Sequence, residues 1–72
     1  MQLHYENLAK LASDNNFYIL ATGQLRTFLA QDLLTDAICI AQYAHDDTGY
    51  YLPEHLDIDY YPSIDEALPK LI

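Results

Sequence analysis

The fold is decided by residues 17–32, which read FYILATGQLRTFLAQD. Residues 17–21 are aromatic, aliphatic or β-branched, a composition that predicts a buried strand. Gly23 can stand at the centre of a tight turn. Residues 24–32 fit a second strand, and they also fit a helix with leucines and Phe28 on one face. We favour the strand, because the turn would then close a β-hairpin.

A helix is expected on each side of this hairpin. Residues 3–13 place four apolar side chains largely on one helical face, and the polar run at 13–16 ends that helix. Residues 34–45 have the clearest helical pattern, because apolar side chains recur at i, i+3, i+4 and i+7. These four residues are Ala37, Ile40, Ala41 and Ala44. We expect them to face the sheet and to pack on Phe17, Ile19 and Leu8.

The C-terminal third predicts turns and short strands. Residues 46–49 read DDTG and predict a turn, since Asp starts turns and Gly permits positive φ. Residues 50–52 predict a short strand. Residues 56–60 alternate apolar and acidic side chains, the pattern of a strand with one solvent-exposed face. Ser63 with Glu66 three residues later is a capping box, which predicts the start of a short third helix.

The predicted element order is therefore α-β-β-α-β-β-α. Short loops between such elements favour an α+β fold, a small and mainly antiparallel sheet with two or three helices packed on one face. With 72 residues the chain is expected to form a single compact domain, residues 1–72. Domains of this size bury only about 60% of the surface that the unfolded chain exposes. Because 51% of the residues are hydrophobic, we expect apolar surface to remain that a homodimer or a partner could cover.

Residues 1–6 contain no basic region and no apolar run, which argues against a signal peptide. No stretch approaches the roughly 20 apolar residues of a membrane span. A single cysteine fits a reducing compartment, so the sequence predicts a cytoplasmic protein. Its acidity also predicts no direct binding to nucleic acid and no binding to a membrane, since both carry negative charge.

Catalytic and cofactor motifs do not occur in the sequence. Cys39 lies between two isoleucines and is expected to be a small buried hydrophobe rather than a reactive thiolate. Two glycines are too few for a phosphate-binding or dinucleotide-binding loop. A chain of this length also struggles to enclose a substrate pocket and keep a core. We therefore expect no enzyme activity and no cofactor.

Six side chains were considered as metal ligands: His45, Asp46, Asp47, His55, Asp57 and Asp59. Oxygen-rich sets of this kind suit calcium, magnesium or manganese. Their spacing, however, lacks the third ligand and the glycine of a calcium-binding loop. No His-x-x-x-His or Cys-x-x-Cys pair occurs either. The sequence therefore predicts no metal site.

Residues 46–72 carry the strongest functional signal. They hold seven of the eleven acidic residues and one of the three bases, which gives this segment a net charge of −6 out of −8. Four of the seven tyrosines lie among these acids. Concentrated charge interleaved with tyrosine is typical of a surface that binds a basic protein. The expected partner-binding residues are Asp46, Asp47, Tyr50, Tyr51, Glu54, Asp57, Asp59, Tyr60, Tyr61, Asp65 and Glu66.

In size and charge the chain resembles small phage counter-defence proteins, such as anti-CRISPR or anti-restriction DNA mimics. This resemblance is one of composition. It implies an inhibitor that blocks the nucleic-acid site of a partner, with several of the seven carboxylates forming one contiguous exposed patch. The alternative is a small accessory or toxin-neutralising protein that buries an apolar face in a dimer or a stoichiometric complex.

Overall fold

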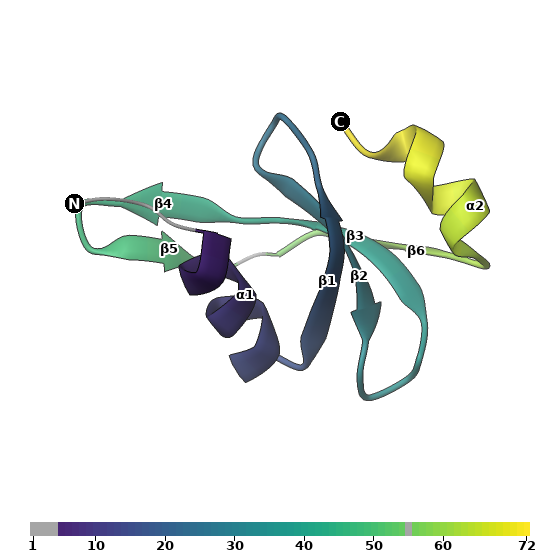
Figure 1. The fold of residues 1–72 in the computed structure, drawn as a ribbon, viewed down its shortest axis with the longest axis horizontal. Coiled ribbons are helices and arrows are strands. Elements are labelled where there is room, and N and C mark those ends of the chain that lie inside the picture. The colour runs from purple at the N-terminus through teal and green to yellow at the C-terminus, as the bar shows by residue number, and fades with distance from the viewer. Residues whose placement is uncertain (1–4, 55) are drawn as a thin grey trace.

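The computed structural model of the chain describes residues 5–54 and 56–72 (Figure 1). In chain order the elements are α1 (Tyr5–Asp14), β1 (Phe17–Thr22), β2 (Thr27–Asp32), β3 (Ile38–Gln42), β4 (Ala44–Asp46), β5 (Gly49–Tyr51), β6 (Ile58–Tyr61), α2 (Ile64–Ala67) and the 3₁₀ turn η1 (Leu68–Lys70). Strands β1, β2, β3 and β6 form one antiparallel sheet in that order, and β4 pairs with β5 in a separate hairpin. None of the helices among these residues has the length and apolar character needed to cross a bilayer.

The mixed α+β class and the antiparallel sheet are confirmed, but the helices are fewer and shorter than predicted and lie on opposite faces of the sheet. Phe28 and Leu29 are neighbours on β2, so their side chains point to opposite faces, and both are almost fully buried. Phe28 clusters with Ala12 of α1, whereas Leu29 clusters with Ala67 of α2. Figure 1 shows the two helices on either side of β1. The sheet therefore has a core on each face.

The hairpin predicted at residues 17–32 is confirmed, with a turn longer than expected. The turn comprises residues 23–26 and is closed by the Gly23 N–H, which donates to the Thr27 carbonyl at 2.8 Å. The left-handed residue is Arg26, with φ of 56°. Gly23 is required for a different reason, because a Cβ there would collide with Thr27 Oγ1 and with the carbonyl of Ile72. The last residues of the chain thus pass directly over this turn.

Strand β1 is less buried than its composition predicts. Its burial alternates along the strand, and a register shift against β2 occurs between Ile19 and Ala21. Tyr18 is 60% exposed and Leu20 is 39% exposed. The physical reason is position, since β1 is at the edge of the sheet and pairs with β2 alone.

The helix predicted at residues 34–45 is wrong. The chain instead turns after β2 and then forms β3 and β4. Ile40 and Ala41 are neighbours on β3 and are both buried, on opposite faces of the sheet. Ala44 belongs to β4, so the four apolar residues do not share a face. A strand covered on both faces is apolar at every position, and this hides the two-residue period that identifies a strand.

The turn before β3 is fixed by local hydrogen bonds. Asp32 Oδ1 accepts from the Leu34 N–H at 2.9 Å, and the Asp32 carbonyl accepts from the Asp36 N–H at 2.7 Å. Asp36 has φ of 63°, which is left-handed and stops any continuing right-handed helix. Asp32 therefore starts the turn, and β3 returns beside β2.

The remaining short elements agree with their local signals. A two-residue turn joins β4 to β5, with Gly49 at φ of 130°. The Ser63 hydroxyl accepts from the Glu66 N–H at 3.2 Å and caps α2, as predicted. After η1, the Ile72 carbonyl accepts from the Leu25 N–H at 3.1 Å and from the Thr27 hydroxyl. These bonds attach the C-terminal segment to the β1–β2 turn. Helix α1 follows the predicted 3–13 helix closely, although residues 3 and 4 lie outside the described part.

We predict that Leu29→Ala lowers the free energy of unfolding by about 2–5 kcal/mol, because it removes a fully buried side chain from the core beneath α2. Leu34→Ala is the matched control. Leu34 is 76% exposed, so its truncation should change stability by less than about 0.5 kcal/mol. Urea unfolding followed by far-UV circular dichroism measures both. Equal midpoints for Leu29→Ala and the wild type would contradict this core.

Candidate functional site

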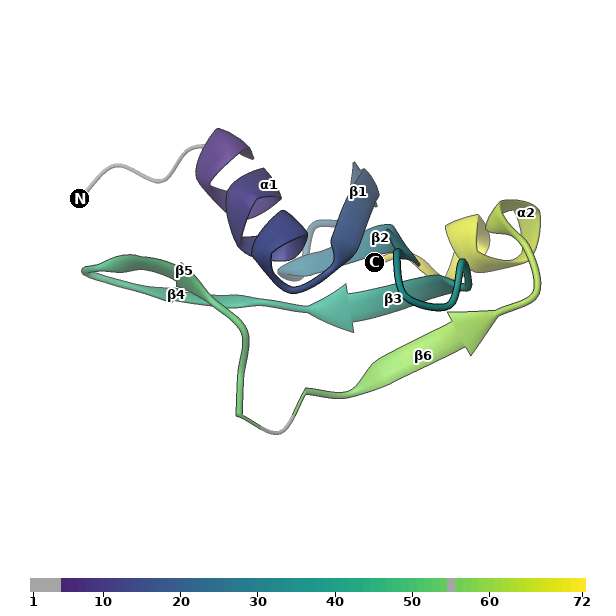
Figure 2. The same ribbon diagram turned by 90° about the horizontal axis from the view of Figure 1, so that it is seen from below.

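The seven acidic side chains of the predicted partner-binding surface are all exposed. They lie along residues 46–66, which run from the β4–β5 hairpin past β6, the strand at the far edge of the sheet from β1, to α2. Figure 2 shows this path: β4 and β5 stand at one end, β6 runs along the lower edge, and α2 stands at the other end. We call this series of carboxylates the acidic edge. It comprises Asp46, Asp47, Glu54, Asp57, Asp59, Asp65 and Glu66.

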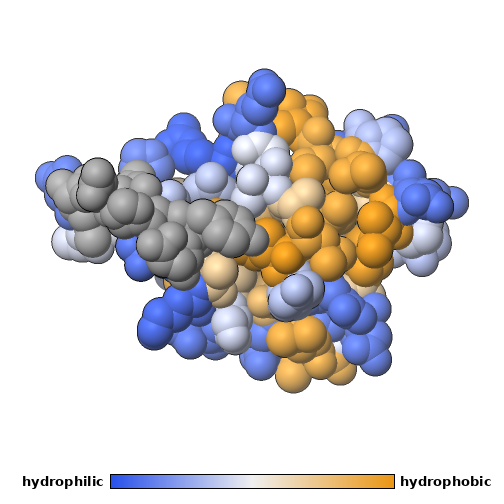
Figure 3. Space-filling view, in the orientation of Figure 1, coloured by the Kyte–Doolittle hydropathy of each residue, from blue (hydrophilic) through white to orange (hydrophobic). Residues whose placement is uncertain are grey.

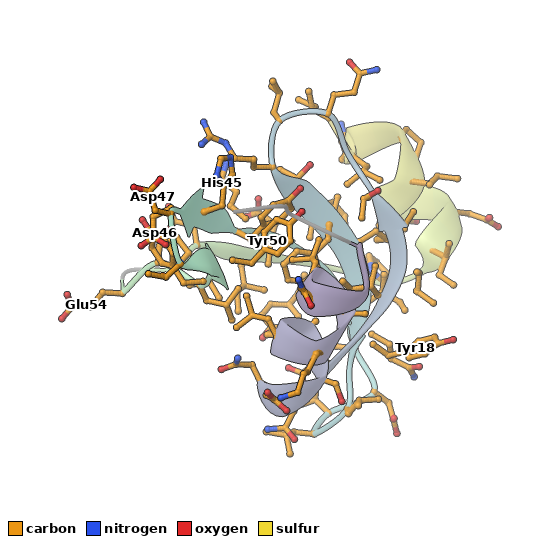
Figure 4. The ribbon with its side chains drawn as sticks, turned by 60° about the vertical axis from the view of Figure 1, so that its left-hand side comes forward. Tyr18, His45, Asp46, Asp47, Tyr50 and Glu54 are labelled. Atoms are coloured by element: carbon orange, nitrogen blue, oxygen red, sulfur yellow. The ribbon has the colours of Figure 1, made fainter. Side chains whose placement is uncertain are left out.

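One end of the acidic edge is the β4–β5 hairpin. Asp46 and Asp47 lie at its tip, and Glu54 follows shortly after β5; all three point away from the body of the molecule (Figure 4). Asp46 Oδ1 accepts from the Thr48 hydroxyl at 2.6 Å and from the Thr48 N–H at 2.8 Å. These two hydrogen bonds, the hydroxyl first, hold the pKa of Asp46 below its usual value. The tip therefore keeps its charge.

Aromatic rings attach this hairpin to the core. The Tyr50 ring meets the Tyr43 ring edge to face, with centroids 5.4 Å apart. Tyr43 in turn lies 6.3 Å from the ring of Phe28. His45 meets the Tyr50 ring at 6.4 Å. Tyr50 is half-buried and links the hairpin to the core, so it contributes to holding the acidic tip in place as well as to its surface.

The middle of the acidic edge is the region of β6. Asp57 and Asp59 are exposed and alternate with half-buried apolar residues, as the sequence predicts. Asp59 lies opposite Ile40 on β3, and therefore on the α2 face of the sheet. A carboxylate on an edge strand keeps other strands from pairing with it. Asp57 and Asp59 thus give this edge of the sheet its negative charge and hinder the pairing of another strand with β6.

The two tyrosines of β6 have different roles. Tyr60 lies opposite Cys39, on the α1 face, and is 55% exposed. Its hydroxyl donates to Asp32 Oδ2 at 3.3 Å. Partial desolvation first, and then the Asp32 carboxylate, raise the pKa of Tyr60. Tyr61 is half-buried beside Ala67 in the α2 core, so it is chiefly a structural residue.

The other end of the acidic edge is α2, with Asp65 and Glu66 in its first turn. Acidic residues there interact favourably with the positive end of the helix dipole. These two carboxylates therefore also stabilise α2. The Cα extents of the molecule are 36 × 24 × 22 Å, and the hairpin tip and α2 lie toward opposite ends of the longest axis (Figure 1). The seven carboxylates form an extended series rather than one compact cluster.

No carboxylate of the acidic edge forms an ion pair among residues 5–54 and 56–72. The ion pair found there joins Lys10 to Asp14 at 3.3 Å, on α1. The same residues contain no group of three His, Cys, Asp or Glu side chains close enough to hold a metal ion. His55, one of the six side chains considered as ligands, lies outside the described residues.

The sequence reading missed Asp32 and Tyr18. Asp32 is a buried carboxylate that accepts hydrogen bonds from the Leu34 N–H in the β2–β3 turn and from the Tyr60 hydroxyl. An Asp two residues before the bonded amide is the pattern of an Asx turn, and this pattern could have identified its role in the turn. Tyr18 is exposed on β1, across the molecule from Asp46, Asp47 and Glu54 (Figure 4). No local signal identifies it, because the exposure follows from the strand order.

We predict that Cys39 does not react with iodoacetamide at pH 8 unless the protein unfolds. Its side chain is fully buried, and burial, followed by the charge of Asp32, raises the pKa of the thiol from 9.0 to about 11.

The unfolded chain therefore loses this proton at lower pH than the folded one. Ionisation of this thiol should not affect the free energy of unfolding below about pH 9, and should lower it as the pH rises from about 9 to about 11. Alkylation followed by mass spectrometry, with and without urea, measures reactivity. Rapid alkylation without urea would contradict the burial.

Comparison with protein-family models, curated proteins and solved structures finds no match to this chain. Support for a function therefore comes from the charge, exposure and arrangement of the side chains described above.

Proposed function

We propose that the protein is a non-enzymatic inhibitor that binds, through its acidic edge, a basic surface on a partner protein and blocks nucleic acid from that surface. The observation that carries this proposal is the series of seven exposed carboxylates from the β4–β5 hairpin past β6 to α2, none of which forms an ion pair among the described residues. Small phage anti-CRISPR and anti-restriction proteins that mimic DNA are the class that it resembles in size and charge. A basic groove attracts such a series by the same long-range field that attracts nucleic acid.

The acidic edge carries less negative charge per unit length than the DNA that it would imitate. Duplex DNA carries one charge per roughly 1.7 Å of its axis, whereas the acidic edge spreads seven carboxylates over a molecule 36 Å long. Charge density alone would therefore favour DNA over this protein in the same groove. Short-range contacts must supply the difference, and Tyr51 and Tyr60, 45% and 55% exposed, are the aromatic side chains of this segment placed to make them.

This division of roles predicts separate kinetic effects. Charge acts at long range and accelerates encounter, whereas aromatic contacts slow dissociation once the complex has formed. Asp57→Asn with Asp59→Asn should slow association and flatten its salt dependence. Tyr60→Ala should chiefly speed dissociation, because its ring is exposed.

The test begins with the immobilised protein exposed to an extract of its native host. Bound proteins are eluted with rising salt, identified by mass spectrometry and assayed for nucleic-acid binding in competition. Surface plasmon resonance at two salt concentrations then compares the variants. The matched control is Asp14→Asn with Asp36→Asn, which removes the same charge from exposed positions outside the acidic edge. Equal association rates for the two double variants would overturn the proposal.

A second class of function is supported by a different observation. An accessory or toxin-neutralising protein would bind its partner through an apolar face, and Tyr18 and Leu20 present such a face on β1. Salt separates the two functions, because an apolar complex persists in high salt while an electrostatic one dissociates. Partners retained in high salt and lost with Tyr18→Lys would favour this second class.

A further inference from the structure

The two edges of the sheet differ in how they are protected from pairing. Strand β6 is flanked by Asp57 and carries Asp59, and charged side chains on an edge keep other strands away. Strand β1 reads FYILAT and contains no charge and no proline. Every second residue of an edge strand points its N–H and C=O groups away from the sheet. The Phe17–Ile19 part of the β1 edge is therefore open to another strand, whereas the register shift after Ile19 hinders regular pairing beyond it.

The surface around β1 is apolar and hollowed. Figure 3 shows the side of the molecule that carries β1, with hydrophobic residues over its centre and over α2. A hollow of about 400 Å³ lies beside β1, lined by Ala9, Ser13, Phe17, Tyr18, Ile19 and Leu33. Side chains that insert into such hollows supply much of the affinity of protein interfaces. We call this surface the β1 face.

The distribution of charge indicates which partner fits the β1 face. A protein with a net charge of −8 repels its own copies unless their charges stay apart. Strand β6, with Asp57 and Asp59, lies three strand spacings from β1, roughly 14 Å, and the β4–β5 hairpin and α2 lie toward the two ends of the longest axis (Figure 1). Two copies joined at β1 would therefore keep the carboxylates of β6 on the two far sides of the assembly, and those of the hairpin and α2 toward its ends. Uncharged β1 would be the point of contact.

The available area is compatible with such an assembly. A stable interface of standard size takes roughly 800 Å² from each partner. This is about one sixth of the total accessible surface of 4959 Å². The view in Figure 3 is down the shortest axis, so the side that it shows has the two longer extents, 36 and 24 Å.

We propose that the β1 face is the interface of a homodimer, in which β1 pairs antiparallel with β1 of a second copy across a two-fold axis. Tyr18 and Leu20 lie at the contact. The assembly stops at two copies, because the remaining free edge of each sheet is β6, which its aspartates protect. The dimer presents two acidic edges, which makes it bivalent. The interface itself does not depend on what the acidic edge binds.

Sedimentation equilibrium of the full chain over a range of concentrations tests this. We expect a transition from the monomer mass of 8.3 kDa to twice that value. High salt should strengthen the dimer, because it screens the repulsion between two acidic copies. A monomer at every concentration up to about 1 mM, or assembly beyond the dimer, would overturn the proposal.

Two lysine substitutions then locate the interface. Tyr18→Lys should raise the dimer dissociation constant at least about tenfold by placing a charge at its centre. Tyr51→Lys is the matched control, since it makes the same chemical change at an exposed tyrosine outside the β1 face, and it should leave the dimer intact. Equal weakening by both substitutions would contradict an interface at β1. Binding of a basic partner through the acidic edge should be weakened by Tyr51→Lys and left intact by Tyr18→Lys. A failure of the dimer proposal can therefore be distinguished from a failure of the proposed function.

Hydrogen exchange of the wild-type protein gives a readout that needs no variant. The outward amides of β1 should be protected at concentrations where the dimer forms and should exchange faster on dilution. Amides of β6 that point away from the sheet should exchange at the same rate in both conditions. Concentration-independent exchange throughout β1 would overturn the proposal.

Discussion

Burial of β2 on both of its faces is the constraint on which the rest of the structure depends. Phe28 and Leu29 are consecutive and point in opposite directions, so each face of the sheet needs a cover. Helix α1 covers Phe28, and α2 with the C-terminal segment covers Leu29. The second cover is short: α2 has four residues, and the segment after it is held to the β1–β2 turn by the Ile72 carbonyl, which accepts from the Leu25 N–H and the Thr27 hydroxyl.

The two exposed edges of the sheet follow from this arrangement. Both helices cover faces, and neither closes an edge, so β1 and β6 remain open at opposite sides (Figure 2). The sequence gives the two edges different chemistry. Acidic residues flank and occupy β6, whereas β1 is uncharged and presents Tyr18 and Leu20. The sheet therefore has one acidic edge strand and one uncharged edge strand. Salt should act differently on contacts made through them, because it screens long-range charge and does not weaken apolar burial.

The acidic edge is held in place by the core beneath it. Rings of Tyr43 and Tyr50 connect the β4–β5 hairpin to Phe28, and the Tyr60 hydroxyl bonds to buried Asp32. Side chains fixed in this way lose less freedom when a partner binds, and preorganisation of this kind strengthens binding without adding contacts. Half of the tyrosines expected at the surface thus serve a structural purpose: Tyr50 and Tyr61 are half-buried, while Tyr51 and Tyr60 are exposed.

Local signals in the sequence determined the β1–β2 hairpin, the turn at residues 46–49, the Ser63 cap and the exposure of the acidic residues, because each depends on neighbours only a few positions away. The tertiary structure alone decided that Ile40 and Ala41 belong to a strand, since a strand buried on both faces loses its two-residue period and mimics an apolar helix. It also decided that the helices lie on opposite faces and that Tyr18 is exposed. Strand order sets both, and strand order depends on pairing between residues distant in the chain, which no local pattern encodes.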